Sequence, residues 1–171
     1  MIRVDYMKKT NRKDLIVLTT VFFWILIVNI GSALMGLVGW PMFFVPIFFF
    51  IQGADKGKIP SIFIGATLGL LSSYFLVVGL HFLTPSIGLV LSFVIMITII
   101  LAMIIIGGAV FPIACNNVAF AYLTANTINL EGVSFSSTVT NILVLLIGGG
   151  IMLGGAIGAS EIGKRITNVS R

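Results

Sequence analysis

The sequence predicts an all-α membrane protein with six transmembrane helices, two of them short and interrupted by proline. Three observations lead to this fold class. Hydrophobic residues make up 58% of the 171 residues and charged residues only 9%, against about 25% charged residues in soluble domains. No Lys or Arg occurs between residues 59 and 163. The apolar runs lack the alternation of a membrane β-barrel, so they must satisfy their backbone hydrogen bonds as helices.

Four apolar runs are long enough to cross a hydrocarbon core of about 30 Å, which takes roughly 20 helical residues. They cover residues 15–37, 60–83, 87–107 and, rich in glycine, 139–159. Two shorter apolar stretches, residues 41–51 and 110–125, are broken by proline or dotted with Asn. By themselves these stretches fit a short crossing or a re-entrant hairpin equally well.

The distribution of basic residues chooses between these two arrangements. Five basic residues precede the first run, Lys56 and Lys58 follow the first short stretch, and three more follow residue 163. Because loops rich in Lys and Arg stay on the cytoplasmic side, all three clusters belong on one face, which requires both short stretches to cross. Re-entrant stretches would instead give four crossings and place the Lys56 loop outside. The sequence therefore predicts six crossings.

This topology divides the chain into three parts. Residues 1–14 form a cytoplasmic N-terminal segment, residues 15–160 a single transmembrane domain, and residues 161–171 a cytoplasmic tail. We expect a tight turn at Thr84-Pro85-Ser86 to join the third and fourth crossings. The net charge of +5 favours contact with anionic membrane lipids. It does not indicate nucleic-acid binding, because the basic residues are divided among three separate segments.

A shift of 71 residues brings the two halves of the sequence into register. It places Trp40-Pro41 on Phe111-Pro112 and residues 15–37 on 86–108. The predicted repeat units, residues 15–83 and 87–159, each contain a long, a short and a long helix. With three crossings per unit, the second would be inverted, and inverted repeats with interrupted helices are typical of transporters. Chance is the alternative, because few identities survive the shift.

Several short motifs resemble those of a known family. They are Gly39-Trp40-Pro41, Phe48 to Gly53 followed by a Lys-Gly loop, Gly65-Ala66-Thr67, Phe111 to Cys115 and Ala119-Phe120-Ala121. The sequence resembles the uncharacterised bacterial inner-membrane family known as domain of unknown function 1097, departing from it at Asp55, where a second Gly is usual. The resemblance implies a multi-helix protein of the bacterial cytoplasmic membrane. It implies nothing about a substrate.

Candidate site residues cluster at the two helix breaks. Asn116 and Asn117 directly follow Pro112 and Cys115, and a carboxamide offers hydrogen-bond donors and an acceptor without charge. A break in a helix also frees backbone groups that can bind a solute. We therefore predict that Asn116, Asn117, Pro112 and Cys115 line a solute path together with Pro41. The alternative is that Asn116 and Asn117 cap the broken helix.

The other Asn residues have plainer interpretations. Asn29 and Asn141, within long helices, are expected to hold helices together through hydrogen bonds. Asn126 and Asn129 are expected to be caps or loop residues outside the core.

No Asp, Glu, Lys or Arg lies within the predicted crossings, which argues against a proton-coupled pump that works through carboxylates. His81 is the only histidine and is expected at the outer interface. A single His and a single Cys cannot form a metal site or a nucleophile and base pair. We therefore expect no metal, no cofactor and no enzymatic activity.

Glycine recurs every four residues in the last helix, at Gly150, Gly154 and Gly158. Such a stripe allows another helix to approach closely, and we expect it to pack against the bundle or against a second copy. The leading hypothesis is a channel or facilitator for a small uncharged solute. The alternative is an accessory membrane protein that forms homo-oligomers through this stripe and transports nothing.

Overall fold

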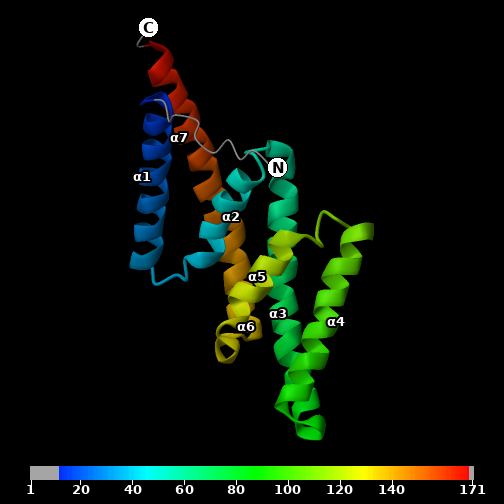
Figure 1. The fold of residues 1–171 in the computed structure, drawn as a ribbon. Coiled ribbons are helices and arrows are strands. Elements are labelled where there is room, and N and C mark those ends of the chain that lie inside the picture. Colours follow the sequence, from blue (N-terminus) through cyan, green and yellow to red (C-terminus); the bar gives the residue numbers. More distant parts are fainter. Residues whose placement is uncertain (1–11, 170–171) are drawn as a thin grey trace.

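The computed structural model describes residues 12–169, which form helices and turns with no strand in that range (Figure 1). Residues 1–11, most of the predicted N-terminal segment, and the last two residues of the predicted tail lie outside it. The elements are α1 Arg12–Leu34, α2 Trp40–Ile51, the 3₁₀ turn η1 Lys56–Lys58, α3 Ile59–Ile87, α4 Leu89–Val110, α5 Asn117–Thr127, the 3₁₀ turn η2 Leu130–Gly132, α6 Phe135–Leu143, the π-helical η3 Val144–Gly148 and α7 Gly149–Val169. Since α6, η3 and α7 are continuous, they form one long helix.

The all-α prediction is confirmed, with four helices long and apolar enough to cross a membrane. These are Leu15–Leu34, Lys56–Ile87, Leu89–Val110 and Phe135–Ile162. The other two helices, α2 and α5, have only 12 and 11 residues. At 1.5 Å per residue they extend about 18 and 17 Å, roughly half of a hydrocarbon core.

Two expected boundaries were wrong. The turn between the third and fourth helices is at Gly88, whose φ of +79° suits glycine, and α3 continues through Pro85 to Ile87. A proline in the last turn removes one backbone donor without breaking the helix before it. The second short helix begins at Asn117 and not near residue 110, so that Pro112 lies in the connection before α5.

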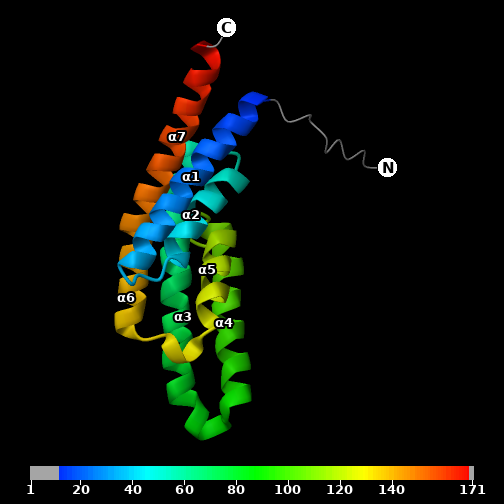
Figure 2. The ribbon, with the colours of Figure 1, turned by 90° about the vertical axis from the view of Figure 1, so that its left-hand side faces the viewer.

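The helices pack in an order that is repeated in the two halves of the chain. The long helix α1 packs against α7 as α4 packs against α3. The short helix α2 packs against η3 and α7 as α5 packs against α3. The α1/α7 pair and the α3/α4 pair project toward opposite ends of the molecule, and α2 and α5 lie between them (Figures 1 and 2).

Equivalent boundaries of the two halves are 76 or 77 residues apart, so the predicted shift of 71 residues does not describe the structure. The ends of α1 and α4 are Leu34 and Val110, and the starts of α2 and α5 are Trp40 and Asn117. The starts of α3 and α6, Ile59 and Phe135, differ by 76. The match between Trp40-Pro41 and Phe111-Pro112 therefore aligns a helix start with a connecting segment.

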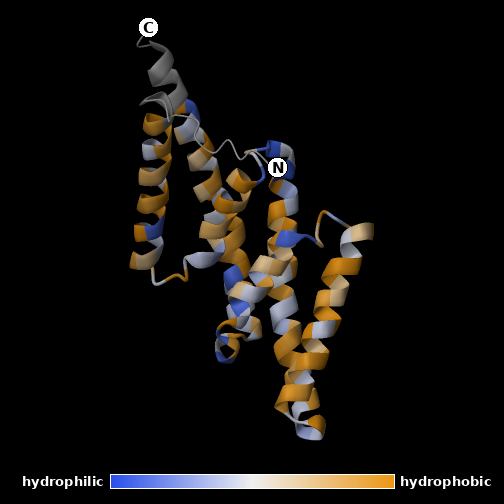
Figure 3. Cartoon of the chain, in the orientation of Figure 1, coloured by the Kyte–Doolittle hydropathy of each residue, from blue (hydrophilic) through white to orange (hydrophobic). Residues whose placement is uncertain are grey.

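The described basic residues lie at one end of the bundle. In Figure 1 the start of α1, the turn η1 and the end of α7 all lie toward the top. Lys56 in η1 forms an exposed ion pair with Glu161 in α7, with 3.4 Å between Nζ and Oε1, and Lys164-Arg165 follow within the same helix. Hydropathy colouring shows mostly hydrophobic residues along the long helices and hydrophilic residues near η1, at the start of α5 and around α6 (Figure 3).

Glycines allow the short helices to approach the long ones. A Cβ at Gly69 of α3 would collide with the carbonyl oxygen of Ala119 in α5, and one at Gly149 of α7 would lie 2.8 Å from a methyl group of Val45 in α2. These contacts enclose a buried core of residues from α2, α3, α5, η3 and α7: Val45, Phe49, Ile62, Ala66, Leu70, Val118, Tyr122, Leu145 and Leu153.

Candidate functional site

Asn116, the first predicted site residue, caps α5. Its Oδ1 accepts hydrogen bonds from the backbone N–H groups of Val118 and Ala119, at 2.9 and 3.2 Å. This is the usual role of Asn at a helix N-terminus, where backbone donors have no partner within the helix. Its Nδ2 donates to Ser61 of α3, at 3.2 Å to the carbonyl oxygen and 3.1 Å to Oγ.

Gly65 makes this arrangement possible. A Cβ at Gly65 would lie 2.5 Å from Oδ1 of Asn116. The same amide also donates to the carbonyl oxygens of Pro112 and Ile113. Asn116 thus fixes the connection before α5 against α3, and the capping alternative describes its contacts.

The other residues predicted at this break do not converge on a cavity with Asn116. Asn117 and Pro112 are exposed, and Cys115 is a free, half-buried thiol whose Sγ packs close to Gly107 of α4. Pro41 is buried at the start of α2, near the opposite end of α5. The structure therefore does not bring Pro41 together with the four residues of the second break.

An aromatic cluster fills the space between the two short helices. Tyr122 of α5 has no exposed surface, and its hydroxyl donates a 2.5 Å hydrogen bond to the carbonyl oxygen of Pro41. Its ring lies 5.6 to 6.4 Å from the ring centroids of Trp40, Phe44 and Phe48 of α2. Aromatic side chains therefore occupy the space between α2 and α5.

A cavity of about 450 Å³ opens beside this cluster; its lining is mostly apolar but includes three Asn and one Ser, and it is called the polar cavity below. It lies where the N-terminal part of α2, the C-terminal end of α5 and the first turns of α6 meet. Because α2 and η1 are adjacent in the chain and α2 runs toward η1, the cavity is at the end of α2 opposite the basic turn. Its lining is Val38, Trp40, Phe44, Ala125, Asn126, Ile128, Asn129, Gly132, Val133, Ser137 and Asn141.

The polar groups of the cavity are carboxamides and a hydroxyl, with no charged side chain in the lining. Asn126 Nδ2 donates to Oγ of Ser73 in α3, at 2.5 Å. Asn141 Nδ2 points to Oδ1 of Asn126 over a long 3.4 Å. This network leaves the Asn141 carbonyl oxygen and the exposed Asn129 amide able to bind a guest, since each carboxamide offers two donors and two acceptor lone pairs.

The sequence did not indicate this cavity. Asn126 and Asn129 were expected to be caps or loop residues outside the core, and Asn141 was expected to hold helices together. The adhesion role is visible in the contact between Asn141 and Asn126, but the three carboxamides also share one hollow. A usable signal was the concentration of four polar residues, Asn126, Asn129, Ser137 and Asn141, on both sides of one short turn.

Asn29, also expected to hold helices together, instead donates to the carbonyl oxygen of Ile25 within its own helix α1.

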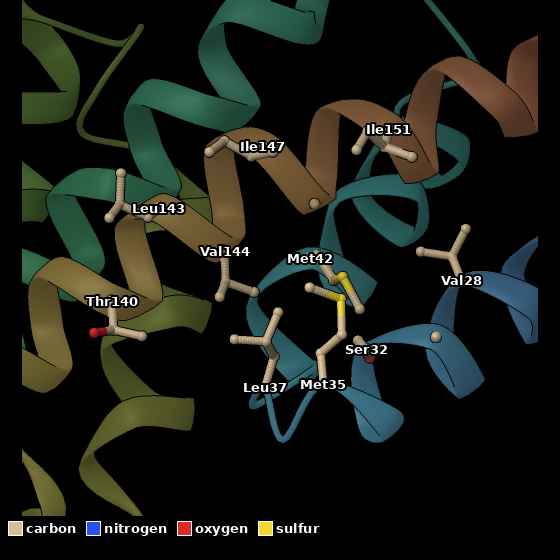
Figure 4. A pocket seen from close by; sticks show the side chains of 12 residues that line it. Val28, Ser32, Met35, Leu37, Met42, Thr140, Leu143, Val144, Ile147 and Ile151 are labelled. Carbon is tan, nitrogen blue, oxygen red and sulfur yellow. The ribbon is translucent and has the colours of Figure 1, made fainter.

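A second cavity, of about 540 Å³, lies between the end of α1, the start of α2 and the α6 to α7 helix. Figure 4 shows its side chains, among them Met35, Met42, Leu143 and Ile147. Its lining is apolar except for Ser32 and Thr140, and Ser32 already donates to the carbonyl oxygen of Asn29. It therefore offers little to bind a polar solute.

The glycine stripe faces away from the other helices that the structure describes. A Cβ added at Gly150, Gly154 or Gly158 would meet nothing within 4 Å among the described residues. The intervening Gly155 instead receives the indole of Trp24 from α1, which also donates to the carbonyl oxygen of Met152 at 3.1 Å. Packing of the stripe against the bundle, one of the two predicted arrangements, is therefore not seen among the described residues.

Within the described residues, no group of three or more His, Cys, Asp or Glu side chains is placed to bind a metal ion. Comparison of the chain with family models, with curated proteins and with solved structures found no match. The resemblance to domain of unknown function 1097 therefore stays a prediction, and the functional argument depends on the geometry of the polar cavity.

Proposed function

We propose that the chain crosses the bacterial cytoplasmic membrane with six segments and has both ends in the cytoplasm. The support is the gathering of the described basic residues at one end of the bundle, at Arg12-Lys13, Lys56, Lys58 and Lys164-Arg165, since such residues mark the cytoplasmic side. The short helices α2 and α5 reverse the direction of the chain as complete crossings would. In this orientation the polar cavity opens toward the outside.

We also propose that the two halves are inverted repeats. The long, short, long order of α1 to α3 recurs in α4, α5 and the α6 to α7 helix, and equivalent helices make equivalent contacts. Half a turn about an axis perpendicular to the view of Figure 1 would bring the α1/α7 pair approximately onto the α3/α4 pair. In transporters built this way, binding sites lie near the interrupted helices.

The proposed function is the facilitated passage of a small uncharged polar solute. The observation that carries it is the cavity lined by Asn126, Asn129, Ser137 and Asn141, because uncharged donors and acceptors can replace the water around a neutral solute. Its volume of about 450 Å³ suits small-molecule sites, which are typically 300 to 1,000 Å³. No catalytic group is needed for this function.

The aromatic cluster around Tyr122 indicates which side of the proposed solute path is closed in this conformation. The cluster fills the direct path between the two short helices. The hydrogen bonds from Asn116 to Ser61 hold the start of α5 against α3 on the proposed cytoplasmic side. The conformation therefore corresponds to a state open to the outside and closed to the inside. Passage would require rearrangement around the short helices, as in transporters that alternate between two faces.

Solute flux into proteoliposomes tests the proposal. We expect purified protein to accelerate uptake of a neutral solute, with glycerol, urea and acetamide as the set to be measured. Asn126→Leu should lower that uptake by about tenfold or more, since it removes two hydrogen bonds at the cavity. Asn117→Leu is the matched control, because Asn117 is exposed and lies outside the cavity. Equal rates in protein-free vesicles and wild-type vesicles for every solute would refute facilitated passage.

A second candidate function has support from the glycine stripe. Gly150, Gly154 and Gly158 form a smooth surface on α7 that no described residue covers, which favours contact with another helix in the membrane. A non-transporting accessory protein would use this surface to form homo-oligomers. If Gly154→Leu leaves the oligomeric state in detergent unchanged, the stripe does not have this role.

A further inference from the structure

The polar cavity combines aromatic rings and carboxamides in one lining. Trp40 and Phe44 of α2 contribute the rings, and carboxamides come from α5, the connection after it and α6, at Asn126, Asn129 and Asn141. Aliphatic side chains form much of the remaining lining. Sites for small molecules are commonly built in this way, with apolar and aromatic walls and a few polar groups that fix the orientation of the ligand.

Trp40 and Phe44 form the aromatic wall of the cavity. They are four residues apart on α2, so they lie one helical turn from each other, and their ring centroids are 5.8 Å apart. Both rings also pack near the ring of Tyr122, yet both residues are only half-buried. The cluster therefore does not cover either residue completely, and both still line the cavity.

The polar side chains of the lining differ in how far their hydrogen-bonding groups are already used. Ser137 belongs to the capping box of α6, and Asn126 donates to Ser73 of α3. Asn129 makes no capping bond with its side chain, and Asn141 makes only the long bond to Asn126. Asn129 and Asn141 are therefore the carboxamides with free donors and acceptors.

A neutral amide is the complement of these two carboxamides. It carries N–H donors and a carbonyl acceptor, so it can exchange N–H···O=C bonds with an Asn side chain in both directions. The lining contains no charged side chain, and burying a charge without a partner is costly. A neutral ligand therefore fits the cavity better than a carboxylate or an ammonium group.

The size of the cavity favours a ligand larger than urea or glycerol. Its volume of about 450 Å³ equals that of about 15 water molecules at ~30 Å³ each. A ligand without a ring would leave the aromatic wall without a contact. An aromatic ring placed there gains from ring-to-ring contact beyond the burial of its surface.

We propose that the polar cavity binds a neutral aromatic amide, a flat ring that bears an uncharged carboxamide. This inference rests on the proposed function and names the class of its solute. The ring lies against Trp40 and Phe44, and the amide bonds to Asn129 and Asn141. Urea and glycerol use only the polar side of this site, so they are poorer ligands.

Equilibrium dialysis of the wild-type protein in detergent tests the ligand class, with protein-free micelles as background. Benzamide has both features, cyclohexanecarboxamide lacks the aromatic ring, acetamide lacks any ring, and benzylamine replaces the amide by an ammonium group. We expect benzamide to bind saturably and about two- to tenfold more tightly than cyclohexanecarboxamide, because of the ring contacts. Acetamide and benzylamine should bind more weakly still. Equal or tighter binding of any of these three would overturn the assignment.

Tryptophan fluorescence locates the bound probe. The chain has two Trp residues, of which Trp40 lines the cavity, whereas Trp24 packs against Gly155 and donates to the carbonyl oxygen of Met152. Benzamide should change the emission of the Trp24→Phe variant, in which Trp40 is the only tryptophan. It should leave the emission of Trp40→Phe unchanged. A change confined to Trp24 would place the ligand elsewhere and overturn the site.

Single substitutions separate the two sides of the site. Asn141→Leu removes a hydrogen bond to the amide, and Phe44→Leu removes a ring contact, so each should lower the affinity for benzamide by about three- to tenfold. Asn117→Leu is the matched control, because Asn117 is exposed and lies outside the lining. Wild-type affinity in both Asn141→Leu and Phe44→Leu would overturn the proposed placement of the ligand.

Binding and transport can fail separately. If no probe binds while glycerol or urea enters proteoliposomes faster than it enters protein-free vesicles, the aromatic-amide class is overturned and the proposed function stands. If benzamide binds beside Trp40 and no solute is taken up, the ligand class stands and facilitated passage is refuted.

Discussion

Asn116 stabilises the connection before α5 from both sides. Its carboxamide oxygen accepts from the first turn of α5, and its carboxamide nitrogen donates to Ser61 of α3. Asn116→Ala should therefore lower the free energy of unfolding by about 1 to 3 kcal/mol, combining the loss of a cap with the loss of interhelical bonds. Thermal unfolding in detergent measures this, with the exposed Asn117→Ala as control. Equal losses in both variants would contradict the capping role.

Tyr122 makes one buried hydrogen bond that can be removed alone. Tyr122→Phe keeps the ring in contact with Trp40 and Phe44 but loses the bond to the carbonyl oxygen of Pro41. We expect a loss of about 1 kcal/mol in unfolding free energy. Tyr74→Phe should cost less, because the Tyr74 hydroxyl forms no hydrogen bond with another described residue. A larger loss for Tyr74→Phe than for Tyr122→Phe would contradict the role of the Tyr122 hydroxyl.

At this scale the sequence predicted the kind of residue but not its position. Because the predicted crossings carry no charged residue, Asn was predicted to line a solute path. Asn residues do line the cavity. Asn116 was predicted to line a solute path because it follows a helix break, yet it caps α5 and also bonds to Ser61 of α3, 55 residues earlier in the sequence. Which carboxamide serves as a cap and which remains free depends on such long-range contacts, which sequence spacing cannot reveal.

Glycines determine how closely the helices of this chain pack, and neighbouring glycines have different roles. Gly155 accommodates the indole of Trp24, whereas Gly154 faces open space. Gly155→Ala should therefore separate α7 from α1 and lower the unfolding free energy by about 1 to 3 kcal/mol. Gly154→Ala should be neutral or slightly stabilising in a detergent-solubilised monomer, because Ala favours helix more than Gly. The reverse order of melting temperatures would show that the α1/α7 contact is described wrongly.

The long and short helices were predictable from hydropathy, because the long apolar runs and the loops between them are distinct in the sequence. The start of α5 was not, since residues 110–115 are as apolar as the helices on either side. Their conformation is decided by Asn116, which holds the connection against α3. The error in the repeat shift has the same cause, because it aligned two prolines with different structural roles.

At the scale of the whole molecule, the proposed function depends on which side of the membrane each end of the bundle faces. The basic turn η1 and the polar cavity lie at opposite ends of α2, and the positive-inside rule assigns η1 to the cytoplasm. The cavity can serve solute capture from outside only if this assignment is correct.

Side-specific thiol labelling in intact cells tests this claim most directly. In a Cys115→Ala background, the exposed positions Asn129 at the cavity and Lys58 in η1 are replaced singly by Cys and treated with a membrane-impermeant maleimide. We expect Asn129→Cys to react in intact cells and Lys58→Cys to react only after the membrane is opened. Reaction of both from the same side would contradict the six-segment arrangement and the outward-facing cavity.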